Sequence, residues 1–211
     1  MVKEPRAGRV KTRLGRDIGS INATWWYRHQ TRALLRRLRD PRWSLVLAVA
    51  PDTACVRSRV WPQDLPCIPQ GDGDLGRRMA RSLGRTTGPS LLIGSDIPGV
   101  SKRHIARAFA LLPSGGSVIG PATDGGYWLV GLDHPRKRCA NLFNEVRWSS
   151  AHTLQDTLRT LPTPTATANT LADVDRGAAL LIDRIISRSS KVRRNTSVTN
   201  SGERGSRTHE K

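Results

Sequence analysis

Cysteine, acidic residues and long apolar stretches are all scarce in this sequence. The three cysteines, Cys55, Cys67 and Cys139, are widely spaced and form neither a disulfide framework nor a C-x-x-C metal pair. No run of about eighteen apolar residues occurs, and no charged segment leads into a short apolar one, which argues against a membrane-spanning helix and a secretory signal. We therefore expect reduced thiols in a cytoplasmic protein.

The shortage of acidic residues makes the chain strongly basic. Lys and Arg number 35 against 17 Asp and Glu, which gives a formal net charge of +18 over 211 residues. Residues 187–211 hold seven Lys or Arg and two Glu, and they contain no aromatic residue. We predict one folded domain over residues 1–186, a length that can bury a sizeable core, followed by a basic disordered tail.

Aromatic residues make up only 5% of the chain, and this limits what the basic charge can mean. No aromatic stacking motif and no zinc-finger spacing accompany the charge, which argues against dedicated nucleic-acid binding. The simplest interpretation is a solvated helix face at residues 32–39 and a solubilising tail. Steering of an anionic nucleotide is one functional alternative, and charge-driven, sequence-blind DNA binding without catalysis is another.

Apolar segments of strand length alternate with helical segments along the chain. Strands are predicted at 43–50, 90–96, 117–122 and 127–133. Helices are predicted at 19–40, 74–84, 101–112, 149–161 and 176–187, with Ser20 and Ser101 as N-caps, and the proline-rich stretch between the first two is expected to be irregular. Buried strands separated by helices indicate an α/β fold with a mixed, mostly parallel sheet, which binds ligands at the carboxyl ends of its strands.

Residues 70–79, QGDGDLGRRM, match the G-x-G-x-x-G spacing of a dinucleotide-binding loop. Such a loop directly follows a strand, whereas three prolines occur in residues 61–70, and prolines disfavour a central strand. Asp72 and Asp74 would also place carboxylates beside a pyrophosphate. We therefore interpret the segment as an ordinary helix start, in which Asp74 interacts favourably with the helix dipole.

Asp96 is the first candidate for chemistry, because it follows an apolar strand and precedes a Pro-Gly turn. A carboxylate there can bind Mg²⁺ or Mn²⁺ together with substrate phosphates, or it can simply cap the turn.

In the N-terminal segment 5–15, PRAGRVKTRLG, Lys11 and Arg13 follow Gly8. These cations suit a phosphate-binding loop, although a solvated basic segment explains them equally well.

Two further segments carry carboxylates. Asp124 precedes Gly125 and Gly126 in a turn where a ligand can approach the backbone closely, although such turns are also common in hairpins. Asp173 and Asp175 are two residues apart, so in an extended segment they face the same way and can share one cation. Alternatively, Asp175 caps the helix that follows it.

The ordered segments together resemble a known family. They read P-x-x-G-x-V-K-T-R-L, Q-x-x-G-D-L-G-x-R-M, L-L-I-G-S-D-x-P-G, G-P-A-x-D-G-G-Y-W-L-V-G-L, W-S and D-V-D. Over residues 4–182 the chain resembles the bacterial glycosyltransferase-A-like (GT-A) family often labelled arsenosugar biosynthesis glycosyltransferase. It is more distantly similar to molybdenum cofactor and phospholactate guanylyltransferases.

The resemblance implies the three-layer, Rossmann-like GT-A fold of the nucleotide-diphospho-sugar transferases. It also implies Mg²⁺ or Mn²⁺, a nucleotide-sugar donor (a nucleoside triphosphate if the reaction is nucleotidyl transfer) and a small-molecule acceptor. Asp96 and Asp124 would be catalytic, and Asp173 and Asp175 would complete a metal site with Asp96. Nucleotide contacts are implied for Gly8, Lys11, Arg13, Gly73, Asp74, Gly76, Gly125 and Gly126.

Two features depart from the family pattern. The N-terminal loop normally follows a complete apolar strand, which is reduced here to Met1-Val2. This departure has two interpretations: the true start of the protein lies upstream of Met1, or the chain is a truncated and inactive copy rather than an active transferase. The Pro-x-Pro-Gly of the family has also become Pro5-Arg6-Ala7-Gly8, which makes the loop less stiff.

Overall fold

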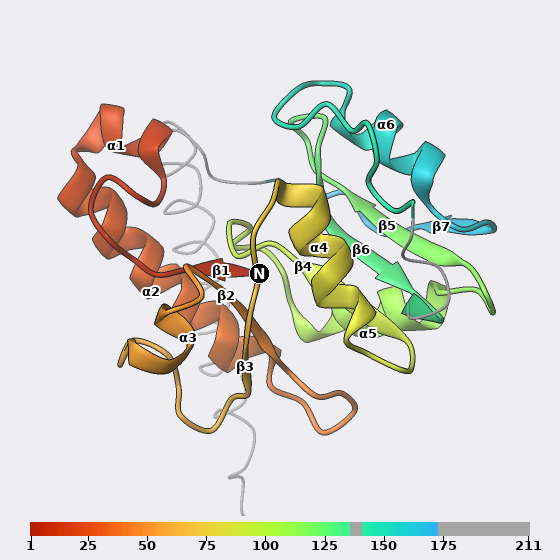
Figure 1. Ribbon diagram of the computed structural model, residues 1–211, viewed down its shortest axis with the longest axis horizontal. Coiled ribbons are helices and arrows are strands. Elements are labelled where there is room, and N and C mark those ends of the chain that lie inside the picture. Colours follow the sequence, from red (N-terminus) through yellow and green to blue (C-terminus); the bar gives the residue numbers. More distant parts are fainter. Residues whose placement is uncertain (136–140, 173–211) are drawn as a thin grey trace, which may run out of the picture.

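The computed structural model describes residues 1–135 and 141–172 (Figure 1). The predicted helix 176–187, the predicted tail 187–211 and the candidate metal ligands Asp173 and Asp175 lie outside the described residues. None of the helices in the described part of the chain is both long and apolar enough to cross a membrane.

Short strands and helices alternate through most of the described chain. The helices are α1 (Thr12–Ile18), α2 (Ser20–Leu38), α3 (Ala54–Arg57), α4 (Leu75–Gly84), α5 (Lys102–Leu111) and α6 (Thr153–Thr160). The strands are β1 (Val2–Lys3), β2 (Leu47–Ala50), β3 (Cys67–Pro69), β4 (Ser90–Ile93), β5 (Ser117–Pro121), β6 (Tyr127–Leu132) and β7 (Thr165–Thr167). This alternation is typical of an α/β fold.

The strands form two sheet segments that meet at β1 and β4. One segment has the order β1-β2-β3 with parallel pairing, and the other has the order β4-β6-β5-β7. In the second segment β6 pairs antiparallel with β4 and with β5, whereas β5 and β7 are parallel. The amino group of Met1 donates a 2.6 Å hydrogen bond to the carbonyl oxygen of Ile93 and joins the two segments. The predicted mixed, mostly parallel sheet is therefore confirmed.

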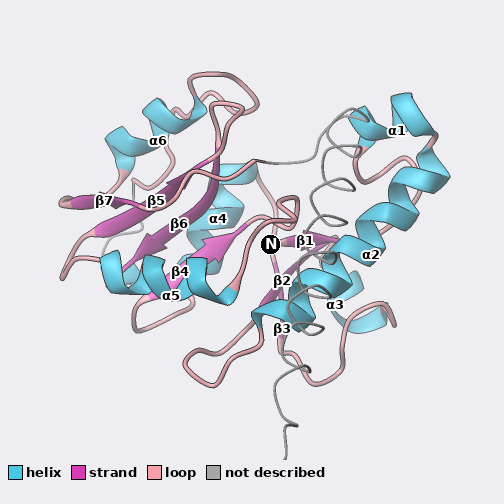
Figure 2. Cartoon of the chain, turned by 180° about the vertical axis from the view of Figure 1, so that it is seen from behind, coloured by secondary structure: helices cyan, strands magenta, loops and turns pink. Residues whose placement is uncertain are grey.

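Helices cover both faces of the second segment, as the two opposite views show (Figures 1 and 2). Successive residues of a strand point to opposite faces, and β5 follows this rule. Val118 packs in the apolar cluster that includes residues of α2 and α5, whereas Ile119 packs in the cluster that includes residues of α4. The three layers predicted for the fold are present.

The proline-rich stretch before the glycine-rich segment is irregular over residues 58–66, as predicted, but the prediction was wrong for its end, residues 67–69. β3 lies there and immediately precedes Gln70. Because β3 is the outer strand of its segment and pairs only with β2 among the described strands, its one proline, Pro69, is tolerated. The buried Gln70 amide then donates hydrogen bonds to the carbonyl oxygens of Val2 and Ala48, at 2.9 and 2.8 Å, and so links this strand end to β1 and β2.

The observed helix boundaries lie close to the predicted ones, and the differences occur at N-caps and at turns. Ser101 caps α5 in a capping box with His104, as predicted, although the bonds of the box are long, at 3.3 and 3.4 Å. Ser20 is the first residue of α2 and does not cap it through its side chain. The predicted helix 149–161 begins only at Thr153, because the preceding residues form turns.

Candidate functional site

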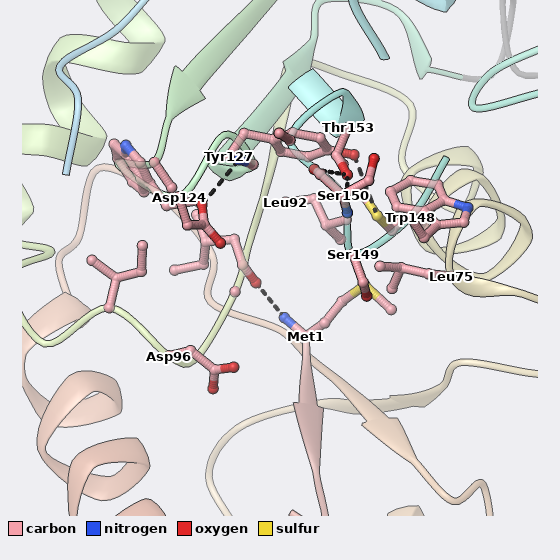
Figure 3. Close-up of a pocket in the computed structure, with 18 of the residues that line it drawn as sticks. Met1, Leu75, Leu92, Asp96, Asp124, Tyr127, Trp148, Ser149, Ser150 and Thr153 are labelled. Carbon is pink, nitrogen blue, oxygen red and sulfur yellow. Dashed lines mark hydrogen bonds between the residues drawn. The ribbon is translucent and has the colours of Figure 1, made fainter. Parts of the chain in front are cut away.

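A cavity of about 450 Å³ opens where β4 and β5 end and β6 begins (Figure 3). This is the carboxyl edge of β4 and β5, where α/β sheets bind ligands. Its walls come from the residues after β4, the β5–β6 turn, α4, the loop before α6, Met1, and Arg13 of α1. Asp96 and Asp124 lie on one side of the cavity as drawn, with Trp148 and Leu75 on the other (Figure 3).

Asp96 is half-exposed at this cavity and forms an ion pair with Lys11. The Lys11 Nζ atom lies 3.2 Å from Asp96 Oδ2, and the Lys11 side chain is only 3% exposed. The same ammonium group lies 5.8 Å from the ring centroid of Trp26 on α2, within cation–π range. Since a buried ammonium group is costly without partners, Asp96 and Trp26 both stabilise Lys11 in its charged form.

A chain of hydrogen bonds reaches Asp96 from β1. The backbone N–H of Lys3 donates to the Tyr27 hydroxyl at 3.0 Å, and this hydroxyl lies 3.1 Å from Ser95 Oγ. Ser95 Oγ in turn donates to Asp96 Oδ1 at 3.3 Å. Burial is the main cause that raises the pKa of Tyr27, so the phenol stays neutral and can donate to Ser95. Ser95 therefore holds Oδ1 of the Asp96 carboxylate, while Lys11 holds Oδ2.

The β5–β6 turn presents Asp124 to the cavity. Asp124 Oδ1 accepts a 2.9 Å hydrogen bond from the backbone N–H of Gly126, which fixes the turn. Gly125 has φ 87°, and a side-chain Cβ there would lie 3.1 Å from the backbone of Ala151. Gly126 lines the cavity, but Gly125 instead lets the turn pack against the loop before α6.

The glycine-rich segment contributes apolar side chains to the cavity, and its glycines do not line it. Asp74 caps α4, because its Oδ1 accepts a 2.8 Å bond from the N–H of Arg77, which confirms the predicted helix start. Gly76 is packed so tightly that an added Cβ would lie 2.9 Å from the ring of Trp148. The side chains that line the cavity from this segment are apolar, those of Leu75 and Met79.

The loop before α6 is held by the buried Asp156. Its carboxylate accepts bonds from the Arg147 guanidinium at 2.7 and 2.9 Å and from the Arg147 backbone N–H at 3.2 Å. Hydrogen bonding to Arg147, more than any other cause, holds the pKa of Asp156 well below its usual value. The anchored loop places Trp148 and Ser149 at the cavity, and Ser149 adopts a left-handed backbone with φ 57°.

The predicted site residues thus fall into two groups. Asp96, Asp124, Arg13 and Gly126 line the cavity, and Lys11 contacts it through Asp96. Gly8, Gly73, Asp74, Gly76 and Gly125 do not line it. Sequence reasoning assigned no role to Tyr27 or Ser95, since a buried hydroxyl network between distant residues leaves no spacing pattern.

The described residues fit a divalent cation bound through one carboxylate. No group of three or more His, Cys, Asp or Glu that could hold a metal occurs in residues 1–135 and 141–172. Mg²⁺ commonly binds through one or two carboxylates and the substrate phosphates, and each Asp96 oxygen keeps a lone pair beyond its present partner. Asp96 could therefore hold such a cation beside a bound diphosphate.

Comparison with known proteins places the chain in a family. Residues 33–150 match the family described as uncharacterized protein conserved in bacteria (DUF2064). The chain belongs to this family. Among curated proteins none matches the chain.

A solved structure is also similar to this member of the DUF2064 family. A protein from Desulfovibrio desulfuricans G20, described as a "putative nucleotide-diphospho-sugar transferase", is 30% identical to the chain. The match has a TM-score of 0.71 and covers 83% of this chain and 80% of that chain. The fold is therefore the GT-A-like fold of nucleotide-diphospho-sugar transferases, as the sequence motifs predict.

Proposed function

We propose that this protein is a glycosyltransferase that uses a nucleotide-diphospho-sugar donor, and that the donor binds in the cavity beside Asp96. The observation that carries the proposal is the cavity itself, which combines the Asp96–Lys11 pair and Arg13 at the carboxyl edge of β4 and β5. A diphosphate needs such cations, and a metal-bound diphosphate also needs the carboxylate. The name of the D. desulfuricans protein supports this class of reaction.

In this proposal the chain positions the donor and stabilises the leaving group. Arg13, which lines the cavity, binds the diphosphate. The buried Lys11 behind Asp96 adds positive charge, which helps to neutralise the charge that develops when the sugar C1–O bond breaks. A divalent cation held by Asp96 would supply further charge neutralisation at the same oxygens. Asp124 uses Oδ1 within its own turn, so Oδ2 is left to accept a hydrogen bond from a hydroxyl of the sugar or acceptor.

The apolar side of the cavity suits the less polar parts of the donor. Trp148 and Leu75 lie away from Asp96 (Figure 3). With Met79, which also lines the cavity, they offer an aromatic face and two aliphatic side chains. An aromatic face can stack on a base or on the C–H face of a sugar.

We infer glycosyl rather than nucleotidyl transfer. Analysis of the released product separates the two reactions, because glycosyl transfer releases a nucleoside diphosphate and nucleotidyl transfer releases pyrophosphate.

Thermal denaturation with and without ligand tests the donor site. Uridine and guanosine diphosphate, each with Mn²⁺, are added at millimolar concentration to the wild type and to Asp96→Asn. We expect at least one nucleotide to raise the Tm of the wild type, because a ligand that binds only the folded state stabilises it. Asp96→Asn should lose that rise, since it removes the carboxylate that faces metal and diphosphate.

Asp64→Asn is the matched control. It removes the same charge from an exposed carboxylate that pairs with Arg39 and does not line the cavity. It should keep the full ligand-induced rise in Tm. A wild type that shows no rise with either nucleotide would refute the proposed donor class and leave the fold assignment in place.

A further inference from the structure

A second cavity, of about 650 Å³, lies apart from the candidate donor site. It is formed by α3, by the chain that follows α3, and by the first residue of β3. None of its lining residues lines the first cavity. Two of the lining residues are the free cysteines Cys55 and Cys67, both of them partly buried.

The two cysteines are neighbours in space although twelve positions separate them in the chain. Both pack against the apolar cluster that β2 shares with α3 and Trp61. Burial raises the pKa of the Cys67 thiol, and the charge and hydrogen bonding of the adjacent Cys55 side chain raise it further. Cys55 on α3 and Cys67 at the start of β3 line the wall of the same open cavity, and α3 packs directly against β3.

We propose that Cys55 and Cys67 are a redox modification site, which closes into a reversible disulfide between α3 and β3. The adjacency of the two side chains and their shared access to the cavity carry this inference. The pair belongs to the solvent-facing side of the fold, so a small oxidant such as hydrogen peroxide can reach it. The site is independent of the proposed donor cavity.

The oxidation balances with hydrogen peroxide as the oxidant. The thiolate of one cysteine attacks the peroxide, forms a sulfenic acid and releases hydroxide. The thiolate of the other cysteine then attacks that sulfur, forms the S–S bond and displaces a second hydroxide. With the two thiol protons the products are one disulfide and two waters, and a dithiol reductant reverses the reaction.

The sequence offers a direct assay, because trypsin cleaves after Arg57 and Arg59, between the two cysteines. Cys55 then lies on peptide 43–57 and Cys67 on peptide 60–77. The full chain is treated with hydrogen peroxide or with dithiothreitol at mildly alkaline pH, where thiolate is more abundant. Free thiols are alkylated, and the digest is analysed by mass spectrometry.

After peroxide we expect the two peptides to remain linked, and dithiothreitol to separate them. Peptide 139–147 carries the third cysteine and should stay alkylated. Cys139→Ser should leave the linkage intact, whereas Cys55→Ser should abolish it. The proposal is overturned if peroxide leaves both thiols free for alkylation, converts them to sulfinic acids without linkage, or links them only within covalent dimers on non-reducing gels.

Discussion

Lys11 is the residue where backbone strain, burial and charge coincide. It precedes α1 with φ 47° and ψ 47°, a left-handed conformation that is uncommon for a residue with a side chain. Strained positions of this kind cluster at functional sites, where neighbouring structure holds them in place. Here the Asp96 carboxylate and the Trp26 ring hold the ammonium group beside the cavity.

Replacing Lys11 by Met removes the charge but keeps an unbranched side chain of similar length. Loss of this cation makes the cavity beside Asp96 more negative, so nucleoside diphosphate binding should weaken by about tenfold, which corresponds to about 1.4 kcal/mol of lost attraction. Isothermal titration calorimetry with Mn²⁺ present measures this change. Lys102→Met removes an equal charge near Asp40 on the surface and should bind like the wild type. Equal affinities for both variants would contradict the role of Lys11.

Single residues of the site were predictable, but their partners were not. Asp96 and Lys11 were both identified as candidates from the residues around them, a strand end and a basic loop. Their contact spans 85 positions of the chain. It arises in the fold, where α1 packs on α2 and Tyr27 of α2 contacts Ser95 after β4. Tyr27 and Ser95 were missed because each is an ordinary residue until the fold places their hydroxyls 3.1 Å apart.

At the scale of elements, the close packing of α4 against the loop before α6 requires a glycine at position 76. A Cβ atom on Gly76 would lie 2.8 Å from Phe143 Cβ and 2.9 Å from Trp148 Cζ2. Real side chains do not approach this closely, so the loop must move away from α4 if any larger residue is present. Because Trp148 lines the cavity, the packing at Gly76 also sets one wall of the site.

Gly76→Ala is expected to lower the free energy of unfolding. Overpacking typically costs about 1–3 kcal/mol, which outweighs the gain of up to about 1 kcal/mol from the better helix propensity of alanine. Gly88→Ala is the control, since an added Cβ there meets no atom within 4 Å. Urea denaturation compares the two variants. A Gly76→Ala protein as stable as Gly88→Ala would show that the loop yields without cost.

Element predictions succeeded where the apolar pattern is strong and failed where tertiary context decides. The β5–β6 hairpin and α5 follow directly from apolar runs, the glycine turn and the Ser101 cap. β3 and β7 are three residues each and exist because a neighbouring strand offers hydrogen bonds. No local pattern in CIP or TAT indicates a strand, and the prolines around β3 suggested the opposite.

At the scale of the whole molecule, the order of the motifs predicted the fold better than the composition did. The net charge of +18 by itself left nucleotide steering and nucleic-acid binding both open. The sheet order brings the N-terminal basic loop, Asp96 and the Asp124 turn to one edge, although they are spread over more than 100 residues. The motifs on which the family resemblance rests therefore come together at one cavity in the fold.

Photo-crosslinking with an azido-nucleoside diphosphate in the presence of Mn²⁺ tests most directly whether the cavity is the donor site. After trypsin digestion we predict label on peptide 86–102, which contains Asp96, or on peptide 148–159, which begins with Trp148. An excess of the unlabelled nucleotide should prevent the labelling. Label that resists competition, or that appears only on peptides remote from the cavity, would contradict the account.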